Sequence, residues 1–277
     1  MKVYIIRLTE NRKEGFMCRL VLLLTIMLSN TCFAELDWAV ALEGDHRSEA
    51  NKKRDVYRHP RETLEFFGLE EGQTVVELSP GGGWYTEVLA PLTRKGTFYA
   101  AHFNANAPSG YAKKSLGRYL QKLGSNMDIY GGVVVSELPS ADDSEIAPAG
   151  SVDMIVAFRN IHSWLRGDNL QRVLKASYSA LKPGGTLGIV QHRSRKEISF
   201  DDMKSSGYVT EQFLISMVEE AGFKLEARSE INGNTRDPAN HPKGVWNLPP
   251  SFADGEKEKQ RYIDIGESDR MTLRFKK

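Results

Sequence analysis

Residues 74–86 constrain the fold of this chain more than any other segment. The run Thr74–Leu78 is apolar and β-branched, as is typical of a buried strand, and it carries the carboxylate of Glu77 near its end. Three consecutive glycines, Gly81–Gly83, then interrupt the chain before a second apolar run over Tyr85–Leu92. Because glycine has no Cβ, the main-chain N–H groups of such a turn can approach a ligand closely. The segment therefore predicts a strand, a ligand-binding turn and a helix.

The spacing of the glycines argues against a dinucleotide site. The fingerprint G-x-G-x-x-G needs glycine at three positions where this chain has Ser79, Gly81 and Trp84. A tryptophan at the last of these positions would hold the helix off the sheet, which disfavours an NAD-linked oxidoreductase. The pattern that fits is an acid, then glycine or serine, then two glycines, all at alternate positions. Glu77, Ser79, Gly81 and Gly83 satisfy it.

Apolar strands alternate with amphipathic helices through the rest of the chain. Further strands are predicted at 96–101, 129–136, 152–158, 186–191, 224–228 and 271–275, and further helices at 107–124, 170–181 and 210–221. The strand at 152–158 is apolar almost throughout, which suits a parallel sheet that is covered on both faces. This order predicts right-handed βαβ units and a doubly wound α/β sheet.

The first 34 residues indicate a secretory signal. An apolar run over residues 20–28 follows basic residues and precedes Cys32 and Ala34, whose small side chains fit a cleavage site. The run is much shorter than the roughly 20 apolar residues that a membrane-spanning helix needs. We therefore expect residues 1–34 to be removed.

Cleavage would leave a mature chain that begins near Glu35 and is exported, to the periplasm in a bacterium, without a stable membrane anchor. Met17 is an alternative start, because the basic segment that follows it is more compact. An uncleaved N-terminal helix would instead leave the protein in the cytoplasm. A lipid anchor at Cys32 is disfavoured, because Asn30 and Thr31 are poor residues for a lipoprotein signal.

Composition excludes several classes of function. Both cysteines, Cys18 and Cys32, lie in the signal segment, so the chain from residue 35 has no thiol for a disulfide, a nucleophile or a metal site. Five of the 37 Lys and Arg residues and two of the 36 Asp and Glu residues also lie there. The remainder is nearly neutral and shows no electrostatic footprint for nucleic acid or an anionic membrane.

Residues 35–277 are expected to form one domain. Helices are predicted over residues 35–72, and their charged run at 45–58 is expected on the surface. The segment 232–269 is rich in loops and proline, and it is either a lid or binding loop or a flexible surface excursion. The pattern leaves both open.

The residues that follow the strands are the candidates for chemistry, because ligands of open α/β sheets bind at the carboxyl ends of the strands. Arg159, Asn160 and His162 follow one strand, and His192 follows the next. Either histidine is a candidate catalytic base, and His162 could instead hydrogen-bond a loop carbonyl and shape the pocket, which we favour. A metal site is disfavoured, because no acid or third histidine is spaced to complete it.

The segment from Glu77 to Thr86 resembles motif I of class I S-adenosylmethionine (SAM)-dependent methyltransferases, and residues 151–160 and 181–187 resemble later motifs of that family. A finer similarity, to predicted methyltransferases of bacteria that carry signal peptides, rests on residues 79–86, 159–162, 191–193, 220–223 and 272–275. The family fold is Rossmann-like and doubly wound, with a mostly parallel seven-stranded sheet and an antiparallel last strand. The resemblance implies SAM as cofactor and methyl transfer to a small-molecule acceptor.

The resemblance also implies which residues contact the cofactor. Those of the turn are Glu77, Ser79, Pro80, Gly81, Gly82, Gly83 and Tyr85, and those after the fourth strand are Arg159 and Asn160. Arg58 is a candidate for the methionine carboxylate, unless it lies on a solvated helix face. Asp142 or Asp143 would accept the adenine amino group, unless both belong to an acidic surface turn.

This chain departs from the family after the second strand. The family has an acid there that binds both ribose hydroxyls, whereas this chain has His102 and Asn104, each with one good acceptor at neutral pH. Either residue could bind the ribose, or His102 could be an ordinary polar residue at a strand end. The missing acid, and the fact that SAM is made in the cytoplasm, favour a rival interpretation. It is an exported, catalytically inactive SAM- or nucleoside-binding or scaffolding protein of the same fold.

Overall fold

The structure is a computed structural model, and it describes residues 36–140 and 145–277. The predicted signal segment and the candidate adenine-binding residues Asp142 and Asp143 lie outside the described residues. Within the described part of the chain, no helix is both long and apolar enough to cross a membrane.

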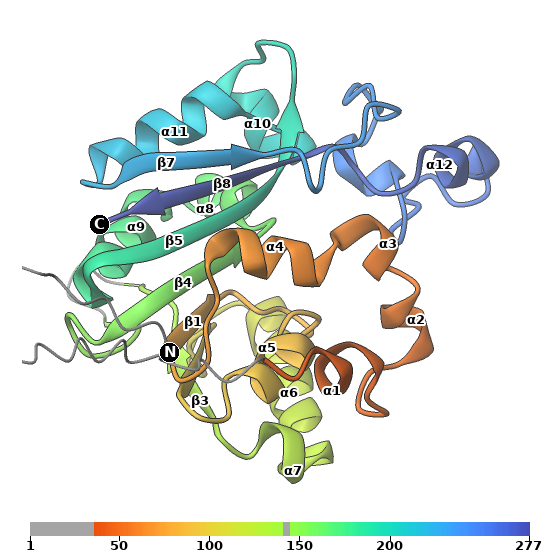
Figure 1. The fold of residues 1–277 in the computed structure, drawn as a ribbon. Coiled ribbons are helices and arrows are strands. Elements are labelled where there is room, and N and C mark those ends of the chain that lie inside the picture. The colour runs from red at the N-terminus through yellow and green to blue at the C-terminus, as the bar shows by residue number, and fades with distance from the viewer. Residues whose placement is uncertain (1–35, 141–144) are drawn as a thin grey trace, which may run out of the picture. The chain divides into compact units, whose positions relative to one another are not determined.

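A mixed sheet forms the centre of the fold (Figure 1). Its strands are β1 (Thr74–Leu78), β2 (Thr97–His102), β3 (Val133–Glu137), β4 (Val152–Phe158), β5 (Leu181–Ser194), β6 (Val209–Thr210), β7 (Lys224–Ser229) and β8 (Arg270–Lys276). Seven of them follow the order β3-β2-β1-β4-β5-β8-β7, and the two-residue β6 pairs with β5 off this path. Strands β1 to β5 are parallel, whereas β8 is antiparallel to both β5 and β7. The predicted fold class is confirmed.

Helices cover both faces of the sheet. One hydrophobic core lies under α8 (Ile161–Arg166), α9 (Leu170–Ala180), α10 (Phe200–Ser206) and α11 (Glu211–Glu220). The opposite core lies under α1 (Trp38–Glu43), α4 (Pro60–Phe67), α5 (Thr86–Leu92), α6 (Gly110–Ser125) and α7 (Met127–Tyr130). The short helices α2 (Glu49–Lys52) and α3 (Asp55–Arg58) link α1 to α4. Central strands are largely buried on both faces, which explains why their sequences are mostly apolar.

The expectation that the charged run at 45–58 lies on the surface is wrong for two arginines. Arg47 and Arg58 are each only 2% exposed. Arg47 donates to Asp55 at 2.7 Å, and Arg58 donates to Glu267 at 3.3 Å. A buried charge needs such a partner, and Glu267 lies too far along the chain for a local pattern to reveal it.

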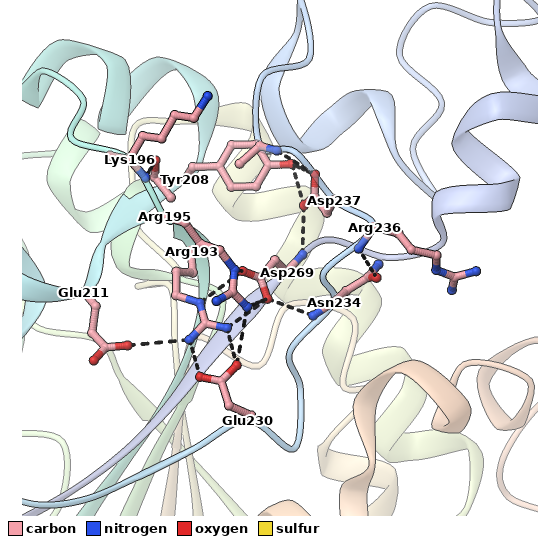
Figure 2. A network of polar contacts seen from close by, with 12 residues as sticks. Arg193, Arg195, Lys196, Tyr208, Glu211, Glu230, Asn234, Arg236, Asp237 and Asp269 are labelled. Carbon is pink, nitrogen blue, oxygen red and sulfur yellow. Dashed lines mark hydrogen bonds and ion pairs between the residues drawn. The ribbon is translucent and has the colours of Figure 1, made fainter.

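The segment 232–269 is anchored to the sheet, so it is not a loose surface excursion. It contains the 3₁₀ helix η1 (Gly244–Asn247) and α12 (Lys259–Ile265). Figure 2 shows the anchor: Arg193, at the end of β5, donates to Glu230 at 2.6 Å and to Asp269 at 3.0 Å. Asp237 in turn accepts from the Tyr208 hydroxyl at 2.9 Å and from the main-chain N–H of Asp269 at 2.8 Å. These contacts hold both ends of the segment at the carboxyl edge of the sheet.

Candidate active site

Two neighbouring cavities lie at the carboxyl ends of the parallel strands. The turn cavity, of about 700 Å³, lies over the ends of β1, β2 and β3, and its walls include Gly81, His102 and Leu138. The basic cavity, of about 680 Å³, lies over β4 and β5, and its walls include Arg159 and Trp246. The two cavities share Ser79, Gly81, Tyr111, Asn160, Ser163 and Arg166. Two ligands bound in them would therefore meet above the turn that follows β1.

That turn is held open by side chains from the β4 end. The Asn160 amide donates to the carbonyl oxygens of Leu78 at 3.0 Å and Ser79 at 3.2 Å, and the Trp164 indole donates to the Ser79 hydroxyl at 3.2 Å. Gly81 has φ +60°, and a Cβ on Gly81 would meet no atom within 4 Å. The backbone at Gly81 therefore faces open space with no side chain in the way, as the glycine pattern predicted.

Two neighbouring non-glycine residues adopt a left-handed backbone conformation. Ser79 has φ 51° and Arg159 has φ 65°, at the ends of the paired strands β1 and β4. This conformation costs a non-glycine residue on the order of 1–3 kcal/mol and persists where the surrounding structure enforces it, often at functional sites. The Asn160 amide supplies that enforcement by linking the two strand ends.

Aromatic rings next to the turn pack against one another and leave the hollow above Gly81 open. Tyr85 stacks on Phe158 with ring centroids 3.3 Å apart, and the Tyr85 hydroxyl donates to the carbonyl oxygen of Arg58 at 3.2 Å. Trp84 contacts Tyr85 edge-on and lies under the Arg58 guanidinium at 4.5 Å. Tyr85 therefore supports the wall of the site and is not part of either cavity lining.

Glu77 lies beneath the turn, and neither it nor Gly83 lines a cavity. Its side chain is 3% exposed and accepts a hydrogen bond from the Thr86 hydroxyl at 2.6 Å. Burial raises the pKa of Glu77 to about 8, and the Thr86 hydroxyl and Lys122 oppose this rise. The carboxyl thus ties β1 to the start of α5, and it supports the turn without contacting a ligand in this arrangement.

We expect Glu77→Gln to stabilise the protein increasingly as the pH rises from about 4.5 to 8. The unfolded carboxyl ionises near pH 4.3, but the folded one stays protonated until about pH 8, so the wild type loses stability over this window. The neutral amide removes that loss, which is on the order of a few kcal/mol. Urea unfolding at pH 5, 6.5 and 8 measures the gain. The exposed Glu219→Gln is the control, and an equal gain at all three pH values would contradict the prediction.

His102 and Asn104 differ in what they can offer a ligand. The Nδ1 of His102 accepts the N–H of Phe103 at 2.7 Å, and its Nε2 lies 3.1 Å from the carbonyl oxygen of Gly81. Both ring nitrogens are therefore used to brace the turn, and neither is free for a ribose hydroxyl. The Asn104 amide donates to the carboxylate of Glu137 at 2.5 Å. Asn104, together with the Glu137 carboxylate that its amide contacts, is thus better placed than His102 to bind the ribose hydroxyls in place of the missing acid.

The basic cavity contains more positive charge than its carboxylates neutralise. Glu267 interacts with Arg54 at 2.6 Å, Arg58 at 3.3 Å and also Arg270. Burial alone would raise the pKa of Glu267, but these guanidiniums hold it well below its usual range. The Arg58 Nη1 is buried and has no hydrogen-bond partner among the described residues. The alternative of a solvated helix face is wrong for Arg58, because its side chain points into the cavity wall.

His162 and His192 both line the basic cavity, with ring centroids 5.6 Å apart. Burial lowers the pKa of His162 to about 4, with Arg166 and Arg159 adding to the shift. Burial also lowers the pKa of His192, and His162 and Arg270 lower it further. Both imidazoles are therefore neutral at pH 7.

Hydrogen bonding distinguishes the two histidines. The Gln191 Oε1 accepts the N–H of Ile161, so its amide nitrogen faces the His162 Nδ1 at 3.3 Å. This arrangement places the proton of neutral His162 on Nε2, which makes it a donor in the pocket rather than a base. The His192 Nδ1 contacts the Ser268 hydroxyl at 2.5 Å, and that hydroxyl can donate or accept. His192 is therefore the better candidate for a base.

The cavities bring together most of the predicted site residues. Ser79, Pro80, Gly81, Gly82, Arg58, His102, Asn104, Arg159, Asn160, His162 and His192 line one cavity or both. Sequence reasoning missed Arg270, which begins β8, and Trp246, in the 232–269 segment. The antiparallel β8 starts at the edge where the parallel strands end, with Arg270 opposite His192. A search that included the start of the antiparallel strand would have found Arg270.

Comparisons with known proteins place this site in context. A family model described as a methyltransferase domain matches residues 51–228. No curated protein matches the sequence. A SAM-dependent methyltransferase structure from Aquifex aeolicus is 21% identical, with 65% of this chain and 87% of that one covered and a TM-score of 0.51. The (4+2)-cyclase SpnF is 17% identical, with 85% of each chain covered and a TM-score of 0.59. These two structural similarities show a shared fold.

Proposed function

This chain belongs to the methyltransferase domain family, and on that premise we propose that it methylates a small molecule held in the basic cavity. It is a SAM-dependent methyltransferase, as its glycine turn predicted. The single observation that supports our placement of the acceptor is the meeting of the two cavities at Ser79, Gly81 and Asn160. A methyl donor over the turn and an acceptor in the basic cavity would face each other there.

The residues present fit SAM. The bare backbone at Gly81 and Gly82 leaves room for the methionine part, and a cavity of about 700 Å³ lies within the usual size range of small-molecule sites. Tyr111 is 69% exposed although it lines both cavities, so its ring is free to stack on a bound group. Arg58, with its unpartnered Nη1, is placed for the methionine carboxylate. Bound SAM would supply a methyl group on a positively charged sulfur.

The protein's own contribution is positioning, exclusion of water and hydrogen bonding to the acceptor. Orientation of two reactants can contribute several kcal/mol to lowering a barrier. Trp246 packs edge-on against His162 and lies over the Arg166 guanidinium at 5.2 Å, so the 232–269 segment forms one wall of the acceptor site. The neutral His192 can accept a hydrogen bond from an acceptor hydroxyl or amine and so orient it, and its lowered pKa opposes full protonation. His162, as a donor, orients the acceptor.

Calorimetric titration of residues 35–277 with SAM and S-adenosylhomocysteine tests the proposal. We expect micromolar binding of both, together with transfer of an isotope-labelled methyl group to an acceptor supplied in a small-molecule extract. Binding without any transfer would favour the rival, a catalytically inactive SAM-binding protein. No heat with either nucleoside would contradict the placement of the cofactor.

We further propose that residues 1–34 direct export and that the protein belongs with the bacterial methyltransferases that carry signal peptides. The proposal rests on the apolar run at 20–28 and the small residues Cys32 and Ala34. Cell fractionation with N-terminal sequencing tests it. A mature end near Glu35 in the periplasm supports export, whereas an intact Met1 or Met17 in the cytoplasm would rule it out.

A further inference from the structure

The charges around the basic cavity do not balance. Four guanidiniums, those of Arg54, Arg58, Arg159 and Arg270, lie close enough to Glu267 to interact with it electrostatically. Among the described residues, no other carboxylate forms an ion pair with any of the four, and none lines this cavity. The group of four guanidiniums around Glu267 therefore carries a surplus of about three positive charges in a partly dehydrated setting.

Several of the guanidinium groups have unused donors. Arg159 makes no side-chain hydrogen bond and no ion pair within the described residues, although it lines the cavity. In the described part of the chain, the Nη1 of Arg58 and the Nε of Arg270 are buried without a hydrogen-bond partner. Leaving a buried donor unsatisfied costs about 1–3 kcal/mol, and more for a charged group. A buried donor in this state needs a partner that the described residues do not supply.

The arginines also repel one another. Burial, together with the charges of Arg270 and Arg54, lowers the pKa of Arg159 to about 10, whereas Glu267 opposes the shift. The pKa of Arg58 is lowered by burial and then by Arg159. Mutual repulsion of this kind makes the free site electrostatically strained, and a bound anion would relieve the strain.

SAM alone does not neutralise the site. It carries one carboxylate, which can balance one guanidinium, but it also brings a sulfonium and an ammonium group. At least two positive charges on the wall remain, next to a cationic donor. A neutral acceptor would leave this repulsion in place, whereas an anionic acceptor would offset it. Guanidinium groups bind carboxylates and phosphates through paired hydrogen bonds.

We propose that the methyl acceptor is a small organic anion whose carboxylate or phosphate group is bound by Arg159 together with Arg270, while Arg58 holds the methionine carboxylate of SAM. Apolar walls at Phe158 and Trp246 would hold the carbon skeleton of this anion. His162 and His192 line the same cavity, with His162 packed edge-on against Trp246, so they would contact an acceptor bound there. This inference rests on the proposed methyl transfer for its meaning, but anion binding itself can be measured without turnover.

Titration with three matched aromatic probes tests the inference. Benzoate, phenyl phosphate and the neutral benzamide are titrated by calorimetry into the protein, with and without saturating S-adenosylhomocysteine. We expect at least one anion to bind and benzamide not to bind. The preference between benzoate and phenyl phosphate then identifies the group. Equal binding of benzamide, or no binding of either anion, would overturn the inference.

Arg159→Gln and Arg118→Gln form a matched pair of variants, because Arg118 is exposed and forms no ion pair with another described residue. We expect Arg159→Gln to weaken anion binding at least tenfold and to raise Tm, because it removes repulsion, whereas Arg118→Gln should change neither. Unchanged anion affinity or a lowered Tm in Arg159→Gln would refute the charge surplus. Binding of S-adenosylhomocysteine to the same samples tests the methyltransferase proposal separately. If the nucleoside binds normally and no anion binds, the anionic acceptor is refuted but the methyltransferase proposal is not.

Discussion

Gly81→Val is expected to abolish detectable SAM binding, with a loss of affinity of about a hundredfold or more. The Cβ at position 81 would project into the space shared by the two cavities, where no protein atom lies within 4 Å. Two added methyl groups would therefore occupy the ligand's place and would not clash with the protein. Because the backbone there has φ +60°, a β-branched residue is also strained, and some stability will be lost. Calorimetry with SAM and urea unfolding separate the two effects.

Gly150→Val is the matched control for this experiment. Gly150 has φ +64°, and a Cβ there also meets no atom within 4 Å, but it lines neither cavity. We expect a comparable loss of stability with unchanged SAM affinity. If Gly81→Val bound SAM as well as the wild type, the cofactor would not lie over the turn. If Gly150→Val lost binding equally, the effect at position 81 would be one of stability alone.

Glu267→Gln is expected to destabilise the protein by about 3–5 kcal/mol, the usual cost of removing one partner from a buried ion pair. The carboxylate is the only one among the described residues that pairs with Arg54, Arg58 and Arg270. Without it these cations face each other with no anion between them. Urea unfolding at pH 7 measures the loss. The exposed Glu65→Gln, which breaks a surface pair with Arg61, should cost no more than about 1 kcal/mol.

A second substitution and the pH dependence sharpen this prediction. Adding Arg159→Gln to Glu267→Gln should recover part of the lost stability, because it lowers the surplus of positive charge. The pKa of Glu267 is held below its unfolded value, so its contribution is present at neutral pH and is lost as the pH falls below about 4.5. The variant should therefore lose less stability on acidification than the wild type. An unchanged acid dependence, or no rescue by Arg159→Gln, would show that the repulsion is not the cause.

Local signals predicted the elements of this fold well. The glycines after Thr74–Leu78 located the turn, and the apolar run Val152–Phe158 located β4 with its observed bounds. Other observed boundaries differ from the predicted ones by a few residues. Strand β5 already begins at Leu181, directly after α9, and β3 begins at Val133 because α7 occupies the residues before it. Helix ends and strand starts compete for the same residues, and tertiary pairing decides between them.

Apart from Arg58, the candidate site was predictable only where the strand-end rule applied. That rule located Gly81, Asn160, His162 and His192, because parallel strands share one carboxyl edge. It did not identify Glu267, Arg270 or Trp246, because a rule about strand carboxyl ends does not look at the start of an antiparallel strand or at the loop that precedes it. The roles of His102 and His162 also depended on hydrogen-bond partners at Gly81 and Gln191, which no spacing in the sequence encodes.

The sequence by itself determined the family, the alternation of strands and helices along the chain, and the bare turn at Gly81. Each of these depends on residues that are neighbours along the chain. Only the tertiary structure decided that Arg58, Arg159 and Arg270 converge around the single carboxylate of Glu267. Coulomb interactions and burial act through space, so arginines from three separate segments form the anion site that we propose only once the fold brings them to one edge of the sheet.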